Sequence, residues 1–169
     1  MSKFDEKFWK ELDTTLPGWQ SENEARFLIE NIQGDRYVEI GVAYGKSLIL
    51  VEHHYGLDME EITGIDLINH GVDKILNGAN VAYGDSVDFS FTYDDETIDT
   101  LFIDGDHTYE GVKKDIEAWY PKVKKGGTII FHDYQRDKVH EGVQQAVDEI
   151  KDKLSNFRYV RFIAAGEKN

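Results

Sequence analysis

The stretch Tyr37-Val-Glu-Ile-Gly-Val-Ala-Tyr-Gly-Lys-Ser47 predicts a buried strand, a glycine turn and the beginning of a helix. The strand would cover Tyr37 to Ile40, and the turn would run from Gly41 to Gly45. Glycine at both ends of the turn lets the backbone approach a ligand, because no Cβ stands in the way. The N–H groups at the start of the helix would face the polar groups of that ligand. The stretch is typical of a nucleotide or nucleoside cradle, the alternative being an ordinary strand-to-helix turn.

The spacing of the two glycines differs from that of dinucleotide folds. Those folds use G-x-G-x-x-G, in which the middle glycine admits a pyrophosphate. Ala43 occupies that middle position here, and the pattern runs E-x-G-x-x-x-G-x-S from Glu39 to Ser47. It resembles the first motif of S-adenosylmethionine-dependent methyltransferases, in which the acid before the glycines lies near the methionine end of the cofactor.

The composition is that of one ordinary soluble domain. The chain has 169 residues, which is enough for a hydrophobic core. Its 33 acidic residues against 19 Lys and Arg give a net charge of -14, which repels phosphate backbones and argues against nucleic acid as a partner. The absence of cysteine fits a reducing compartment, and no stretch resembles a signal peptide or a membrane span. We therefore expect a cytoplasmic protein without a membrane partner.

Strand patterns alternate with helix patterns along the chain. The predicted strands cover residues 37–40, 61–66, 80–83, 99–104, 128–131 and 157–163. Apolar residues at helical spacing predict helices over residues 3–12, between Ser21 and Gly34, and over Val139 to Leu154. This alternation favours an α/β fold with a Rossmann-like, doubly wound, mostly parallel sheet flanked by helices. We assign one domain over residues 1–169, with N-terminal helices at 1–33, a Rossmann-like core at 34–163 and a tail at 164–169.

Acidic side chains follow the carboxyl ends of the predicted strands, where ligands bind in doubly wound sheets. Asp66 ends the second strand, and its distance along the chain from Gly45 is close to the roughly 20-residue offset at which an acid meets ribose hydroxyls in related folds. The alternative for Asp66 is a surface turn. Asp85 and Ser86 follow the third strand, and in methyltransferases an acid at this place commonly contacts the adenine amino group.

A second group of polar side chains follows the fourth and fifth strands. Asp104 and His107 come after the fourth strand, and His132 and Asp133 after the fifth. Like charges so close together repel, and a divalent cation usually relieves that repulsion. The carboxylates favour Mg²⁺ or Mn²⁺, while an imidazole ligand favours Mn²⁺ or another transition metal. The alternative is that Asp104 caps the following helix and that His132 is a structural histidine.

Two stretches carry a more specific resemblance. They are Asp104-Gly-Asp-His-Thr-Tyr-Glu-Gly-Val112 and Gly126-Gly-Thr-Ile-Ile-Phe-His-Asp-Tyr134. Both resemble the small class I methyltransferases grouped with the cephalosporin hydroxylase and macrocin O-methyltransferase families, and also the cation-dependent catechol-type O-methyltransferases. The resemblance runs from about Trp19 to Leu154, which is most of the chain.

This resemblance implies a role for individual residues. It implies that Asp104, His132 and Asp133 bind a divalent cation, Mg²⁺ or Mn²⁺. It also implies a catalytic base at His107, where the catechol family has a lysine, with Asp106 as the competing base or a further ligand. The implied contacts with S-adenosylmethionine are Glu39, Gly41, Ala43, Tyr44, Gly45, Ser47, Asp66, Asp85, Ser86 and Asp104.

The sequence departs from these families in two places. Only residues 164–169 follow the last predicted strand, so we expect a shortened C-terminal strand region. No segment is long enough for a lid beyond the N-terminal helix and the loop at 134–139, so we expect a large acceptor or a second subunit that completes the site, as in a homo-oligomer.

The predicted function is S-adenosylmethionine-dependent, metal-assisted O-methylation of a hydroxyl group on a small molecule or sugar. One alternative is a hydroxylase-like enzyme in which Asp104, His107 and His132 form a two-histidine, one-carboxylate iron site. The other is a non-catalytic protein that binds S-adenosylmethionine.

Overall fold

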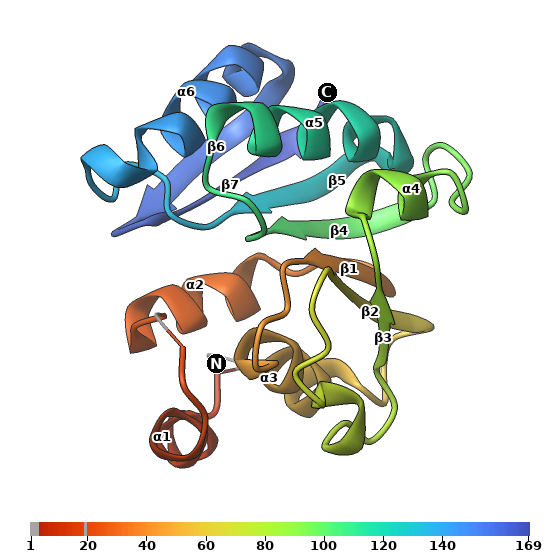
Figure 1. The fold of residues 1–169 in the computed structure, drawn as a ribbon, viewed down its shortest axis with the longest axis vertical. Helices are drawn as coiled ribbons and strands as arrows, with labels where there is room; N and C mark the ends of the chain where they lie inside the picture. The colour runs from red at the N-terminus through yellow and green to blue at the C-terminus, as the bar shows by residue number, and fades with distance from the viewer. Residues whose placement is uncertain (1–3, 19) are drawn as a thin grey trace.

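The computed structural model describes residues 4–18 and 20–169, and within them a seven-stranded sheet lies between two layers of helices (Figure 1). The strand order is β3-β2-β1-β4-β5-β7-β6. The first five strands in this order are parallel, and β7 is antiparallel to both of its neighbours. The strands are β1 (Arg36–Ile40), β2 (Glu61–Asp66), β3 (Asn80–Tyr83), β4 (Ile98–Ile103), β5 (Val123–Phe131), β6 (Leu154–Val160) and β7 (Ile163–Lys168).

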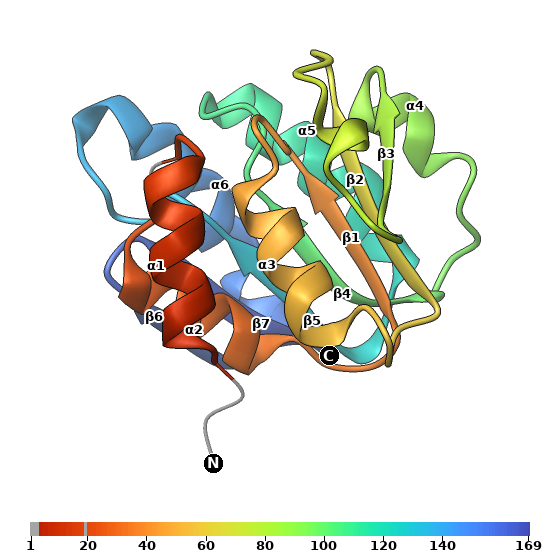
Figure 2. The same cartoon turned by 90° about the horizontal axis from the view of Figure 1, so that it is seen from below.

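Helices lie on both sides of the sheet (Figures 1 and 2). On one face lie α1 (Glu6–Thr15), α2 (Glu22–Asn31) and α3 (Lys46–Tyr55), and on the other lie α4 (Ser86–Ser90), α5 (Tyr109–Trp119) and α6 (Glu141–Ile150). Residue 3 of the first predicted helix and Trp19 lie outside the described residues. A helix long and apolar enough to cross a bilayer does not occur in the described ranges.

The central strand β1 is buried on both of its faces, as expected for a parallel strand between two helix layers. Tyr37 belongs to the hydrophobic cluster with α1, α2 and α3, whereas Val38 belongs to the cluster with α5 and α6. A capping box begins α2, in which the backbone N–H of Ser21 donates to Glu24 Oε2 at 2.7 Å. The predicted doubly wound architecture is confirmed.

Strand β7 shows that the expected shortened C-terminal region was wrong. The residues assigned to a tail belong to Ile163–Lys168, which pairs with β5 on one side and β6 on the other. The range 157–163, predicted as a single strand, therefore includes the turn of a hairpin between β6 and β7. Arg161 in this turn has a φ of 54°. Lys168 is 8% exposed, and its Nζ donates to the carbonyl oxygen of Val123 at 2.8 Å. This segment is a strand because its backbone pairs with β5 and β6, and not because its small residues have a high β-propensity.

Two other predicted boundaries differ from the structure. Strand β5 begins at Val123, whereas the predicted strand began at Thr128, so it also includes Gly126 and Gly127. Helix α6 begins at Glu141, and Val139 lies in a short 3-10 turn before it with 82% of its surface exposed.

The apolar stripe of α6 provides a test of the packing. Val147 is fully buried against the sheet, whereas Val139 is exposed. We expect Val147→Ala to lower the free energy of unfolding by about 1–4 kcal/mol, because it removes buried methyl groups and leaves a cavity. Val139→Ala is the matched control and should stay within about 0.5 kcal/mol of the wild type in urea denaturation. Equal losses at the two positions would contradict this packing.

Candidate active site

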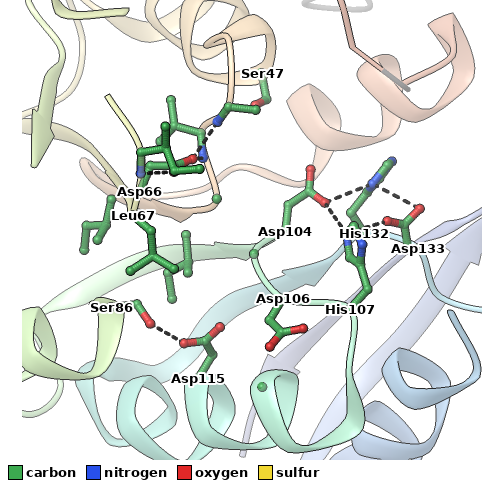
Figure 3. A pocket seen from close by; sticks show the side chains of 18 of the residues that line it. Ser47, Asp66, Leu67, Ser86, Asp104, Asp106, His107, Asp115, His132 and Asp133 are labelled. Carbon is green, nitrogen blue, oxygen red and sulfur yellow. Dashed lines mark hydrogen bonds and ion pairs between the residues drawn. The ribbon is translucent and has the colours of Figure 1, made fainter. Parts of the chain in front are cut away.

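A cleft of about 1150 Å³ opens at the carboxyl ends of the parallel strands (Figure 3). Strands β1 and β4 are neighbours there, and the helices that follow them lie on opposite faces of the sheet, which is where ligands bind in doubly wound folds. Glu39 and Gly45 do not line this cleft. The predicted site residues that do line it are Gly41, Ala43, Tyr44, Ser47, Asp66, Asp85, Ser86, Asp104, Asp106, His107, His132 and Asp133.

The glycine turn holds the ends of β1 and β4 close together. Gly41 has a φ of 86°, and a Cβ on it would lie 2.0 Å from the carbonyl oxygen of Asp104. Any other residue at this position would push the two strand ends apart. Gly41 therefore brings the predicted cofactor cradle next to the predicted metal ligands.

The carboxylate of Asp66 organises the same turn. Its Oδ2 accepts the backbone N–H groups of Val42 at 2.8 Å and Ala43 at 2.7 Å, and its Oδ1 accepts that of Ile68 at 2.8 Å. This use of Asp66 was not predicted from the sequence. A carboxylate has about four acceptor positions, so Asp66 retains capacity for a ribose hydroxyl.

Glu39 lies beneath the turn. Its carboxyl group is fully buried and accepts hydrogen bonds from the hydroxyl groups of Tyr37, at 2.7 Å, and Ser47. Burial raises the pKa of Glu39 to about 8, against the opposing effect of these hydrogen bonds. Glu39 thus positions Ser47, which itself lines the cleft.

The third strand leads into a polar corner of the cleft. Asp85 caps α4 by accepting the backbone N–H of Val87 at 2.8 Å, and the hydroxyl of Ser86 donates to Asp115 (Figure 3). Asp115 is 6% exposed, and burial raises its pKa to about 6. The sequence analysis missed Asp115. The only indication in the sequence is that Asp115 is an acid next to Ile116, on the buried face of an amphipathic helix.

The predicted metal ligands converge at the ends of β4 and β5. His132 Nδ1 lies 3.1 Å from Asp104 Oδ1 and 3.5 Å from Asp133 Oδ1. One ligand atom from each of the three residues lies within 4.8 Å of the other two. Arg136 donates to Asp133 Oδ1 at 2.6 Å. Asp133 has a φ of 58°, a left-handed conformation that aspartate tolerates better than most residues.

His107 joins this group and Asp106 does not. His107 Nε2 lies 3.0 Å from Asp133 Oδ2 and 3.9 Å from Asp104 Oδ1. The exposed Asp106 instead accepts the backbone N–H of Thr108 at 2.8 Å, apart from the group (Figure 3). Among the described residues, the ligand atoms within 4.8 Å of one another form two sets, Asp104 with His132 and Asp133, and His107 with Asp133 and His140. The iron site of Asp104, His107 and His132 suggested for the hydroxylase alternative stays a prediction.

The carboxylates and imidazoles of this group shift one another's pKa. The nearby carboxylates of Asp104 and Asp133 raise the pKa of His107 to about 9. Burial alone would lower the pKa of His132, but the charges of Asp104 and Asp133 and the hydrogen bonds to them together outweigh burial and raise the value to about 10. Burial would likewise raise the pKa of Asp133, but hydrogen bonds from His107 and His132 lower it instead. Without another cation, the imidazoles neutralise the acids.

Glu24 lies behind His132 and was also missed by the sequence analysis. Its Oε1 is buried and lies 3.9 Å from His132 Nε2, and neither atom has a hydrogen-bond partner among the described residues. A metal ligand of this kind usually donates its second ring N–H to a carboxylate. The Glu24 carboxylate thus lies on the Nε2 side of the His132 ring, whereas Nδ1 faces Asp104 and Asp133.

Comparison with known sequences identifies related proteins. Residues 38–134 match a family described as a methyltransferase domain. An uncharacterized protein of Acanthamoeba polyphaga mimivirus, R132, is 34% identical over 141 residues, covering 73% of this chain and 62% of the viral protein. An uncharacterized protein of Sinorhizobium fredii, y4gI, is 38% identical over 52 residues, which are 31% of this chain and 6% of that protein. The chain thus spans less than two thirds of the length of these relatives.

Solved structures share the fold. The MycE methyltransferase of the mycinamycin biosynthetic pathway, solved with Mg, S-adenosylhomocysteine (SAH) and mycinamycin VI, superposes with a TM-score of 0.70 at 18% identity, over 99% of this chain and 56% of MycE. The SAH-bound methyltransferase PaMTH1 of Podospora anserina gives 0.73 at 11% identity, over 96% of this chain and 86% of PaMTH1. These likenesses confirm a Rossmann-like methyltransferase fold. Because the family match covers more than half of the sequence, the chain belongs to the methyltransferase-domain family.

Proposed function

We propose that this chain transfers a methyl group from S-adenosylmethionine to a hydroxyl group of a small molecule or sugar, with a divalent cation bound at the acceptor side of the cleft. One observation carries the proposal. Asp104, His107, His132 and Asp133 meet in the same cleft as the glycine turn, so a nucleoside cradle and a metal-ligand set face one space. The cleft exceeds the roughly 300–1,000 Å³ of a pocket for one small ligand, which suits a cofactor and an acceptor together.

The cofactor end of the cleft fits a cationic nucleoside. The cofactor supplies a methyl group on a positively charged sulfur, and Asp66, Asp85 and Asp104 line the cleft with acidic side chains. Ser47 and the N–H groups at the start of α3 would hold the polar end of the cofactor. The Asp66 carboxylate would accept a ribose hydroxyl while it continues to hold the turn.

The metal end fits a divalent cation, because two carboxylates and an imidazole offer ligand atoms within reach of one ion. The ion would lower the pKa of the acceptor hydroxyl. Asp104, His132 and Asp133 would hold it, and Glu24 would keep the His132 ring oriented. His107, whose side chain is 45% exposed, would take the proton from the acceptor hydroxyl.

Thermal unfolding with ligands tests the cofactor assignment. SAH should raise the melting temperature, because a ligand that binds only the folded state stabilises it by about 2.7 kcal/mol at one hundred times its Kd. NAD at the same concentration is the control and should leave the melting temperature unchanged. A shift with NAD and none with SAH would refute the proposal. A shift with SAH but no turnover on a panel of hydroxyl acceptors would favour a non-catalytic binding protein.

A further inference from the structure

The two oxygen atoms of Asp133 face two different groups of side chains. Oδ1 lies on the side of His132 and Asp104, the first metal-ligand set. Oδ2 lies 3.0 Å from His107 Nε2 and 3.9 Å from His140 Nε2. The ligand atoms of His107, Asp133 and His140 lie within 4.8 Å of one another, as do those of the first set. One buried carboxylate therefore connects two candidate ligand sets.

A second carboxylate fixes the orientation of His140. His140 Nδ1 lies 2.7 Å from Asp137 Oδ1, which also accepts the backbone N–H groups of Val139 and His140. Because Asp137 Oδ1 accepts these backbone N–H groups, it also acts as the acceptor toward the ring, which places the proton on Nδ1. In the neutral ring Nε2 is then left unprotonated, on the side of Asp133 and His107. A carboxylate behind a histidine in this way is the usual support of a metal-ligating imidazole.

We propose that His107, Asp133 and His140 form a second metal site, which takes a transition-metal ion of the Zn²⁺ type. We also propose that an ion in this site restrains methyl transfer, because it occupies the His107 nitrogen that would accept the proton of the acceptor hydroxyl. This second statement rests on the function proposed above, whereas the first does not.

The chemistry of the donors separates this site from the first. Two imidazole nitrogens and one carboxylate oxygen, with room for a fourth ligand, suit Zn²⁺, which prefers four-coordinate sites of nitrogen, sulfur and oxygen donors. Mg²⁺ prefers six oxygen ligands and keeps several of its waters. The side chain of His107 is 45% exposed and that of His140 is 14% exposed, so an ion can enter from the cleft. Mg²⁺ should therefore occupy the first set, and Zn²⁺ should add to the second.

Metal binding without substrate tests the site directly. We would titrate the full chain with Co²⁺, followed by its visible absorption, and with Zn²⁺ by calorimetry. Wild-type protein should bind one more ion than His140→Ala. Asp137→Asn should keep this site but weaken it by about 10–100-fold, the usual effect of losing the carboxylate behind a ligand. His70→Ala, at an exposed histidine outside both ligand sets, is the control and should bind like the wild type.

Activity measured in saturating Mg²⁺ tests whether an ion in the second site restrains methyl transfer. Added Zn²⁺ should inhibit the wild type and should inhibit His140→Ala at least ten-fold less strongly. Equal binding of Zn²⁺ and Co²⁺ by wild type and His140→Ala would overturn the site itself. If wild type and His140→Ala differ in Zn²⁺ binding but are inhibited equally by Zn²⁺, the inhibitory ion lies at the first set. That result would overturn the proposal that an ion in the second site restrains methyl transfer. If the chain shows no methyl transfer at all, the proposed function is wrong. The comparison of metal binding by wild type and His140→Ala still shows whether the second metal site exists.

Discussion

Asp133→Asn is expected to abolish binding of the activating cation and to reduce methyl transfer to the background rate. Asp133 is 1% exposed, and its carboxylate faces the side chains of His107, His132, Arg136 and His140. The substitution removes the negative charge and leaves the shape nearly unchanged. Asparagine also tolerates the left-handed backbone at this position, so the loop need not rearrange.

The measurements are Mn²⁺ binding by calorimetry and turnover by release of SAH. Affinity for SAH should stay within a few-fold, because the glycine turn does not contact Asp133. Asp58→Asn, at an exposed acid outside the cleft, is the matched control and should retain both metal binding and turnover. Full activity in Asp133→Asn, or full activity of the wild type in excess chelator, would rule out the metal assignment.

His107→Ala should lower the turnover rate by about 10²–10⁴-fold, the usual cost of a lost general base, while Mn²⁺ binding at the first set persists. The reason is that His107 borders this set without being needed to complete it, since Asp104, His132 and Asp133 supply the ligand atoms. Added imidazole should restore part of the rate, which loss of a merely structural side chain would not allow.

Asp106→Asn decides between the two candidate bases. The Asp106 carboxylate accepts the backbone N–H of Thr108 and lies apart from the ligand group, so its loss should cost much less than the loss of His107. The reverse order of effects would make Asp106 the base.

The parallel half of the fold could be predicted because its signals are local. Residues 61–66 and 80–83 form strands at the predicted bounds, and both glycines of the first turn, Gly41 and Gly45, have positive φ. Strand β7 could not be predicted in the same way. Ala164, Ala165 and Gly166 carry little strand propensity, and pairing with β5 and β6 places them in the sheet.

The same difference between local signals and long-range packing separates the site residues that were predicted from those that were missed. The residues found from the sequence follow strand ends, so their neighbourhood follows from the alternation of strands and helices. The residues that were missed, Glu24, Asp115 and His140, lie in or beside helices. Asp115 and His140 line the cleft and Glu24 lies behind His132 only because elements far apart in the chain pack together, and local spacing carries no information on that packing. Asp66 was found, but its bonds to Val42 and Ala43 depend on the exact path of the turn.

The interior position of β7 bears on how the protein is made. Ribosomal synthesis delivers β5 first, then β6, and only then β7 at Ile163–Lys168. Until those residues emerge, the nascent chain carries β5 with one side of its backbone unpaired, and such open strand edges favour association with other chains. The parallel strands that border the cleft are synthesised before β7. The seven strands nevertheless form one sheet only when β7 inserts between β5 and β6, both of which are already made.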